Sequence, residues 1–173
     1  MKVAEAIAQF IAGYVDTVFL VNGGANLHIV HAIAHTKGLR YVCPQGEQGA
    51  SFAADAYARL RGFGCALATS GPGATNLVTG IAASYYDSVP VLYLTGQQSR
   101  SRMRGDSGCR QIGFQETPIV EIVKPITKYA VTVMDKDCLM AELQTAVTIA
   151  KQGRKGPVLI DVPDDLQREE LES

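Results

Sequence analysis

The chain has 173 residues, 47% of them hydrophobic, and a formal net charge of −1 at pH 7. This length and apolar content suffice for one domain with a buried core. Because the charges nearly balance, nothing favours a nucleic acid or an acidic membrane surface as a partner, and we expect neither.

The first residues, MKVAEAIAQFIAG, show apolar side chains at helical spacing together with Glu5 and Gln9. This pattern predicts an amphipathic helix that ends at Gly13, rather than a signal peptide. No apolar run approaches the length of a membrane span, so we expect no membrane partner and a cytoplasmic compartment.

Strand and helix patterns then alternate along the chain. TVFLV (17–21) is a short continuous apolar run, which is typical of a strand buried on both faces. Further strands are predicted at 39–43, 65–70, 90–95, 128–133 and 157–163, helices at about 26–36, 47–61, 72–86 and 136–152, and an irregular basic loop up to about 113. The alternation predicts an α/β fold with three layers, α/β/α, and a mostly parallel sheet of about six strands.

We expect residues 1–166 to form this one domain. The acidic end of the sequence, DDLQREELES, favours a tail or the start of a linker, which we place at 167–173. The four cysteines are scattered without a CxxC pair, which argues against zinc and favours reduced thiols. His28, His31 and His35 share one predicted helix without an evident carboxylate partner, so an exposed helix face is preferred over a metal site.

Polar and glycine-rich turns follow three of the predicted strands. They are Asn22-Gly23-Gly24, the stretch 44–47, and the stretch 70–73. In folds of this class, chemistry gathers at the carboxyl ends of the strands. The glycine pair does not complete a GxGxxG fingerprint, and TSGPGATN (69–76) lacks the lysine of a Walker loop. Each turn taken alone is explained equally well as an ordinary connection between a strand and a helix.

Glu47 stands where the third predicted helix begins. In one interpretation its carboxylate only stabilises the helix start, by roughly 0.3–1 kcal/mol when exposed. In the other, it faces a bound group that needs a proton, because Gly49, Ala50, Ala53 and Ala54 keep the neighbouring surface low enough for a flat ring. Composition alone leaves both interpretations open.

Four motifs in this order resemble one family: GEQGASFAADAYAR, TSGPGATNLVTG, DSVPVLYLTGQ and GFQETPIVEIVKPITKY. The chain, from about Ala4 to Asp165, is similar to the N-terminal pyrimidine-binding domain of thiamine-diphosphate enzymes of the acetolactate synthase group. The resemblance implies that Glu47 hydrogen-bonds a ring nitrogen of the cofactor's aminopyrimidine and relays a proton there. It also implies that Gln115 reaches toward the reacting centre and that Phe114 shapes the substrate pocket.

The same resemblance implies the residues that hold the cofactor. Gly23 and Gly24 back the pyrimidine, and Pro72 and Asn76 line it across a subunit boundary. The implied cofactor is thiamine diphosphate with Mg²⁺, whose ligands in this family lie in a GDG motif on a separate domain that this sequence does not contain. Full-length members also admit FAD. The implied substrate is a 2-oxo acid such as pyruvate, and the isolated chain is expected to be inactive.

The resemblance further implies a partner chain, either in a homo-oligomer (a dimer or tetramer) or as a complementary diphosphate-domain subunit. Two alternatives remain: the small subunit of a split decarboxylase, similar to sulfopyruvate decarboxylase, or a non-catalytic interaction module. A change of Glu47 to glutamine separates the last case, because a scaffold would be indifferent to it.

The sequence departs from the family pattern at three places. Val21-Asn22 replaces the usual Tyr-Pro before the glycine pair, and Gly46 replaces the usual histidine before the glutamate. The loop between Gln97 and Phe114 is longer and richer in arginine than in typical members. Mobile solvated charge would explain that loop, but we hypothesise that it receives a larger anionic acceptor, such as a nucleotide-linked sugar, through Arg100, Arg102, Arg104 and Arg110.

Overall fold

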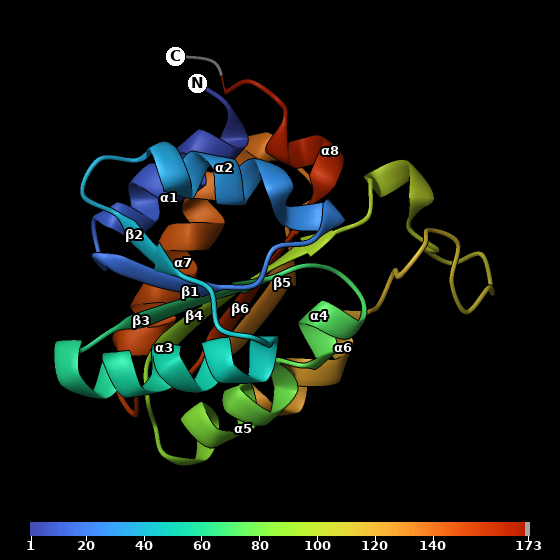
Figure 1. Ribbon diagram of the computed structural model, residues 1–173. Helices are drawn as coiled ribbons and strands as arrows, with labels where there is room; N and C mark the ends of the chain where they lie inside the picture. The colour runs from blue at the N-terminus through green and yellow to red at the C-terminus, as the bar shows by residue number, and fades with distance from the viewer. Residues whose placement is uncertain (172–173) are drawn as a thin grey trace.

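The protein folds around one six-stranded sheet, as a computed structural model that describes residues 1–171 shows. All strand pairs are parallel, in the order β2-β1-β3-β4-β6-β5 (Figure 1). The strands are β1 Thr17–Leu20, β2 Arg40–Val42, β3 Gly64–Ala68, β4 Val91–Gln97, β5 Tyr129–Thr132 and β6 Val158–Pro163. The α/β fold with a parallel sheet of six strands is therefore confirmed.

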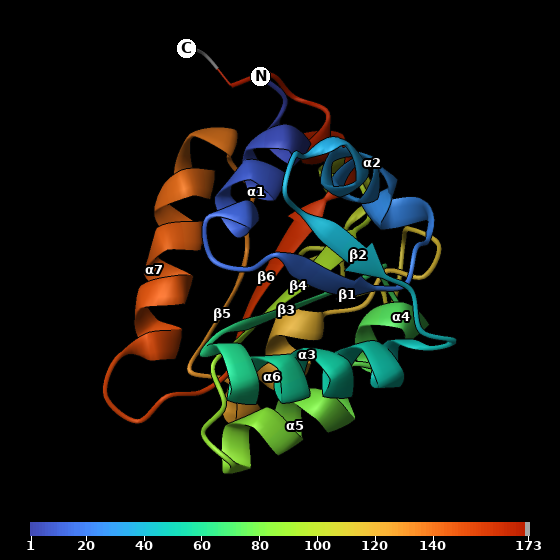
Figure 2. The same cartoon turned by 60° about the vertical axis from the view of Figure 1, so that its left-hand side comes forward.

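Helices cover both faces of the sheet, which makes the predicted three layers (Figure 2). One face packs against α1 Val3–Ala12, α2 Leu27–His35 and α7 Leu139–Lys151. The other face packs against α3 Glu47–Arg61, α4 Pro72–Thr75, α5 Val78–Tyr86 and α6 Ile119–Val123. Short 3-10 turns occur at η1 Gly24–Asn26, η2 Arg100–Arg102, η3 Lys124–Ile126 and η4 Lys136–Cys138.

The central strand β4 shows why an unbroken apolar run is needed here. Every residue of β4 is buried, and successive side chains enter opposite cores because they alternate across the sheet. Leu92 and Leu94 join the core under α1, α2 and α7, whereas Tyr93 joins the core under α3 and α5. Burial on both faces thus fixes the carboxyl ends of the strands, and with them the starting points of the turns that follow the strands.

Two predicted elements differ in the structure. The single helix expected at 72–86 is divided into α4 and α5, because the Leu77 amide donates to the Ala74 carbonyl three residues back and tightens the turn. The acidic end begins with a helix, α8 Asp164–Gln167, rather than with a tail. The side chain of Gln167 is buried and donates to the carbonyls of Ala25 and Val162, at 2.7 and 2.9 Å. The domain boundary at 166 stays a prediction.

Within residues 1–171, no helix is long and apolar enough to cross a lipid bilayer. The four cysteines are free; Cys65 is buried in the core, while Cys43, Cys109 and Cys138 are exposed.

Candidate functional site

The three polar turns meet at one edge of the sheet because their strands are neighbours. Strand β1 lies between β2 and β3, so the turns that follow these strands leave the sheet side by side. The turn after β1 leads into η1, the turn after β2 into α3, and the turn after β3 into α4 (Figure 1). This placement follows the rule that ligands bind outside the carboxyl ends of strands in open α/β sheets.

Thr69 joins two of the turns. A Cβ built on Gly23 would lie 2.5 Å from the Thr69 Cβ, and a Cβ built on Gly73 would lie 2.7 Å from its Cγ2. Neither space admits a side chain, so both positions require glycine. The Thr69 hydroxyl accepts a hydrogen bond from the Ala25 amide at 3.1 Å. The sequence analysis missed Thr69 as a site residue, although it is the first residue of TSGPGATN.

Asn26 fixes the turn that follows β1. Its Oδ1 accepts from the Gly23 amide at 2.8 Å, and its Nδ2 donates to the Val21 carbonyl at 3.0 Å. The side chain is fully buried, so it supplies the partners that the turn's own backbone lacks. Gly23 is held in place by these bonds, while a Cβ on Gly24 would meet nothing within 4 Å.

Glu47 is the first residue of α3, and its half-buried side chain lies over the start of α4. The Asn76 Nδ2 donates to Glu47 Oε2 at 3.0 Å. A Cβ on Gly73 would lie 3.3 Å from Oε1, so the absence of a side chain there keeps this oxygen clear. The structure therefore brings two of the motifs together: one carboxylate oxygen of Glu47 is held by the Asn76 amide, and the other borders an open space beside Gly73.

Pro72 occupies the first position of α4, where its fixed φ suits a helix start. The preceding Gly71 has a φ of +62°, and a Cβ on it would lie 2.6 Å from the Gln115 carbonyl oxygen. The segment around Gln115 therefore lies directly on the turn after β3. Only glycine meets both the positive φ and this close approach.

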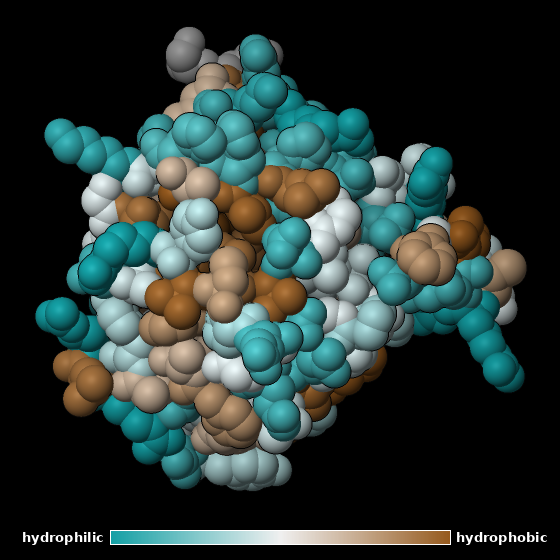
Figure 3. Space-filling model, in the orientation of Figure 1, coloured by the Kyte–Doolittle hydropathy of each residue, from teal (hydrophilic) through white to brown (hydrophobic). Residues whose placement is uncertain are grey.

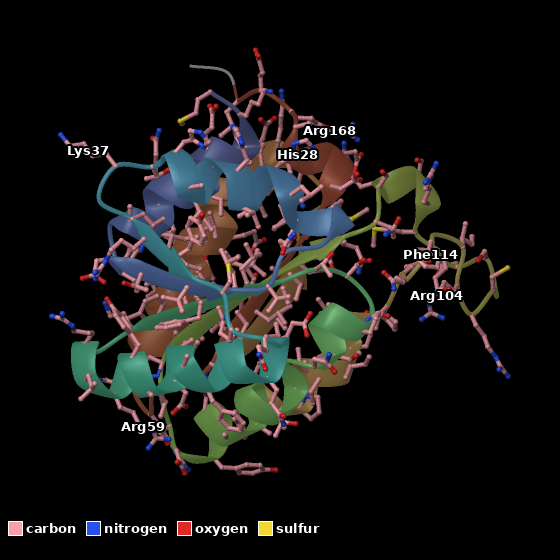
Figure 4. The ribbon with its side chains drawn as sticks, viewed as in Figure 1. His28, Lys37, Arg59, Arg104, Phe114 and Arg168 are labelled. Atoms are coloured by element: carbon pink, nitrogen blue, oxygen red, sulfur yellow. The ribbon has the colours of Figure 1, made fainter. Side chains whose placement is uncertain are left out.

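Phe114 and Gln115 occupy the middle of a turn closed by a hydrogen bond from the Glu116 amide to the Gly113 carbonyl, at 3.0 Å. Gln115 has a φ of +62°, the positive value that a type II turn requires at this position. The Phe114 ring is 79% exposed, on the loop that projects beside the sheet (Figure 4). The structure thus places Gln115 against the turn after β3 but leaves Phe114 in solvent.

The arginines of the long loop are not equivalent, and the expectation of four available cations needs correction. Arg100 forms ion pairs with Asp165, at 2.8 Å, and with Glu169, and it also donates to the Met134 carbonyl. Its hydrogen bonds to Asp165 raise the pKa of the guanidinium further above its usual value. Arg100 is thus already paired with carboxylates of α8 and of the segment after it, whereas the Arg102 and Arg110 side chains are exposed.

The three histidines lie on the exposed side of α2, as preferred from the sequence. The His31 and His35 rings are 4.2 Å apart, and His35 Nδ1 lies 2.8 Å from the His31 carbonyl oxygen. Partial burial, followed by the positive charge of Arg168, lowers the pKa of His28. No carboxylate or thiol from the part of the chain that the structure describes joins them in a group of three potential ligands.

A family model described as the thiamine pyrophosphate enzyme, N-terminal TPP binding domain, matches residues 1–122. The chain belongs to this family. The match covers both glycine turns, Glu47, Asn76 and the turn with Phe114 and Gln115.

Curated relatives point to one group within the family. The chain is 47% identical over 156 residues to the chloroplastic acetolactate synthase 3 of Brassica napus, which is 90% of this chain and 23% of that protein. The same values hold for the chloroplastic acetolactate synthase 2 of Nicotiana tabacum. The chloroplastic acetolactate synthase of Arabidopsis thaliana is 46% identical over the same share of this chain. The chain spans about a quarter of the length of these relatives.

Proposed function

We propose that this domain binds the aminopyrimidine end of thiamine diphosphate, and that Glu47 activates the cofactor in a 2-oxo acid decarboxylase or carboligase of the acetolactate synthase type. The observation that carries the proposal is the Glu47–Asn76 hydrogen bond beside the side-chain-free surface of Gly73. A carboxylate that only stabilised a helix start would not need an amide partner on a second helix.

The residues at the site fit a flat heterocycle. A Cβ on Gly24 or on Gly46 would meet nothing within 4 Å, so the turns after β1 and β2 leave open space at the sheet edge. Gly73 leaves Oε1 of Glu47 accessible from the α4 side. The residues that would border the ring are Gly23, Gly24, Glu47, Pro72 and Asn76.

Glu47 would exchange a proton with a ring nitrogen through Oε1. Asn76 donates to Oε2 and so orients the carboxylate. Thiamine diphosphate, when bound, supplies the electron sink for the loss of carbon dioxide from a 2-oxo acid such as pyruvate. Gln115 would reach toward the substrate and Phe114 would shape its pocket.

The rest of the proposed enzyme lies outside this domain. Mg²⁺ and the diphosphate would be held by a separate domain, and FAD by a further one, so the isolated chain would be inactive. A partner would be a second copy, in a dimer or tetramer, or a diphosphate-domain subunit. The exposed apolar side chains of β2 and α3, namely Tyr41, Val42 and Phe52, suit such an association. Hydrophobic residues also gather on the face of the molecule shown in Figure 3, over which β2 and α3 lie. The proposed compartment is the cytoplasm.

The test compares two first-turn glutamates in the complete enzyme that contains this domain. Glu5, in the first turn of α1, accepts from the Lys2 amide and serves as the matched control. We expect Glu47→Gln to lower kcat for pyruvate decarboxylation by about 10²- to 10⁴-fold, whereas Glu5→Gln leaves it unchanged. A wild-type kcat in Glu47→Gln would contradict the proposal and favour the non-catalytic interaction module.

A further inference from the structure

A buried polar network lies at the carboxyl ends of β4 and β6, beside the candidate site. Asp161 and Gln97 expose 1% and 2% of their surface. Asp161 Oδ1 accepts from the Thr95 hydroxyl at 2.6 Å, and its Oδ2 accepts from Gln97 Nε2 at 3.0 Å and from the Thr132 hydroxyl at 3.1 Å. Nothing in the proposed proton transfer uses these residues.

Gln97 connects this network to the turn that holds Gln115. Its Nε2 donates not only to Asp161 but also to the Thr117 carbonyl, at 2.9 Å, and its Oε1 accepts from the Gln98 amide at 3.0 Å. Two acceptors therefore face Nε2 and one donor faces Oε1, so only one orientation of the amide satisfies all three bonds. Thr117 follows Gln115 by two positions.

Part of the underside of this loop is not packed against the strand ends, although Gln115 lies close to Gly71 and Gly113 lies close to the Gln98 side chain. A cavity of about 320 Å³ separates this part from the strand ends; its lining includes Gln97, Met103, Arg104, Glu116 and Asp161. Glu116 accepts from the amides of Arg104 and Ile112, at 2.6 and 3.0 Å, which ties the loop to itself rather than to the sheet. Where a cavity replaces packed side chains, a hydrogen bond between loop and strand contributes more to the position of the loop.

We propose that Asp161 and Gln97 are positioning residues that place the 113–116 turn for the reaction. The pair, here called the Asp161–Gln97 clamp, fixes the Thr117 carbonyl to the sheet and so fixes where Gln115 sits against Gly71. Asp161 acts through Gln97, because its carboxylate determines which way the amide points. The inference deepens the proposed function and rests on it for the role of Gln115.

Limited trypsin digestion tests the clamp without relying on catalysis. Gln97→Met keeps the side-chain length but removes both polar atoms, and Asp161→Ala removes the acceptor behind them. We expect both variants to speed cleavage after the exposed Arg102 and Arg110 by about fivefold or more. Cleavage after Lys37, an exposed residue remote from the loop (Figure 4), should keep its rate.

Two further variants provide matched controls. Thr132→Val removes a hydrogen-bond donor to the same oxygen of Asp161. The Thr132 hydroxyl donates to Asp161 and not to the loop, so its loss leaves the Gln97 bonds in place. In Asp161→Asn, the amide oxygen still accepts from Gln97 while its NH₂ faces the Thr95 hydroxyl, which can accept. We expect both to be cleaved at the wild-type rate. If Asp161→Ala does not fold, Gln97→Met decides alone, and an unchanged rate in Gln97→Met would overturn the clamp.

Kinetics of the complete enzyme with pyruvate test the positioning role. We expect Gln97→Met to lower kcat by about tenfold while the dependence of the rate on thiamine diphosphate concentration stays unchanged, since the cofactor residues are untouched. Faster cleavage with an unchanged kcat would overturn the positioning role and leave the proposed function standing. Absence of any cofactor-dependent turnover in the wild-type enzyme would overturn the proposed function, and the role of the clamp with it.

Discussion

Two regions flank the same edge of the sheet but are held in different ways. The first region comprises the turns after β1 and β3. There the backbone packs so closely against the Thr69 side chain that no Cβ fits on Gly23 or Gly73. In the second, the loop between β4 and α6, Gln97 donates to the Thr117 carbonyl beside a cavity of about 320 Å³, while Glu116 accepts from the Arg104 amide within the loop itself.

This difference separates two kinds of function on one scaffold. Close-packed turns fix the position of a group to a fraction of an ångström, which proton exchange with a ring requires. A loop held by a few hydrogen bonds tolerates insertions and altered charge without disturbing the core. We therefore propose that the glycine turns bind the cofactor and that the loop contributes to the choice of substrate.

The packing of the glycine turns can be tested by adding a single methyl group. Gly23→Ala should lower the free energy of unfolding by about 1–3 kcal/mol, because the new Cβ meets Thr69. Gly24→Ala is the matched control, since nothing lies within 4 Å of a Cβ there, and it should change stability by less than about 0.5 kcal/mol. Urea denaturation measures both, and equal losses would contradict the close packing.

The buried carboxyl group behind the loop makes stability depend on pH. Burial raises the pKa of Asp161 to about 6, although hydrogen bonds from Thr95, Gln97 and Thr132 oppose this. The native state thus binds the proton more tightly than the unfolded state, so this contribution to stability is complete below about pH 4 and is lost as the pH rises through about 6.

Asp161→Asn removes this titration and keeps the shape of the side chain. Between pH 7.5 and pH 5, the wild-type protein should gain about 1–2 kcal/mol of unfolding free energy relative to the variant. Urea titrations at the two pH values provide the measurement. A difference between the two proteins that is independent of pH would show that Asp161 titrates near its unfolded value.

The beginning of the loop, just after β4, is anchored by the ion pairs of Arg100. Arg100→Gln removes the ion pairs with Asp165 and Glu169, which are half-buried, and should lower the free energy of unfolding by about 1 kcal/mol. Salt should reduce the difference, because it screens such pairs. Denaturation at low and high ionic strength measures the loss of unfolding free energy, and Arg102→Gln serves as the control. A loss in Arg100→Gln that does not depend on salt would contradict the role of the ion pairs.

The smallest effect on stability is expected at the exposed ring of Phe114. Phe114 is 79% exposed, so Phe114→Ala should change the free energy of unfolding by less than about 0.5 kcal/mol. In the complete enzyme the same change should alter KM for the 2-oxo acid, because the ring would shape that pocket. Identical KM values would remove Phe114 from the substrate site.

The sequence predicted β1, β3, β4 and β6 well because their buried apolar runs require a sheet covered on both faces. Glu47 and its turn were likewise visible as a carboxylate at a helix start. Thr69 and Asn26 were not, because their roles depend on distances between turns that are far apart in the sequence. The division of the helix at Leu77 also escaped the pattern, because it depends on a backbone bond to Ala74 that side-chain periodicity does not reveal. The helix α8 escaped it because it depends on tertiary hydrogen bonds such as that from Gln167 to Ala25.

The most direct measurement is a crystal structure of the complete enzyme with thiamine diphosphate bound. The account predicts that Oε1 of Glu47 lies within about 3 Å of a pyrimidine ring nitrogen while Asn76 still donates to Oε2. A Glu47 side chain that points into solvent, with the ring bound elsewhere, would contradict it.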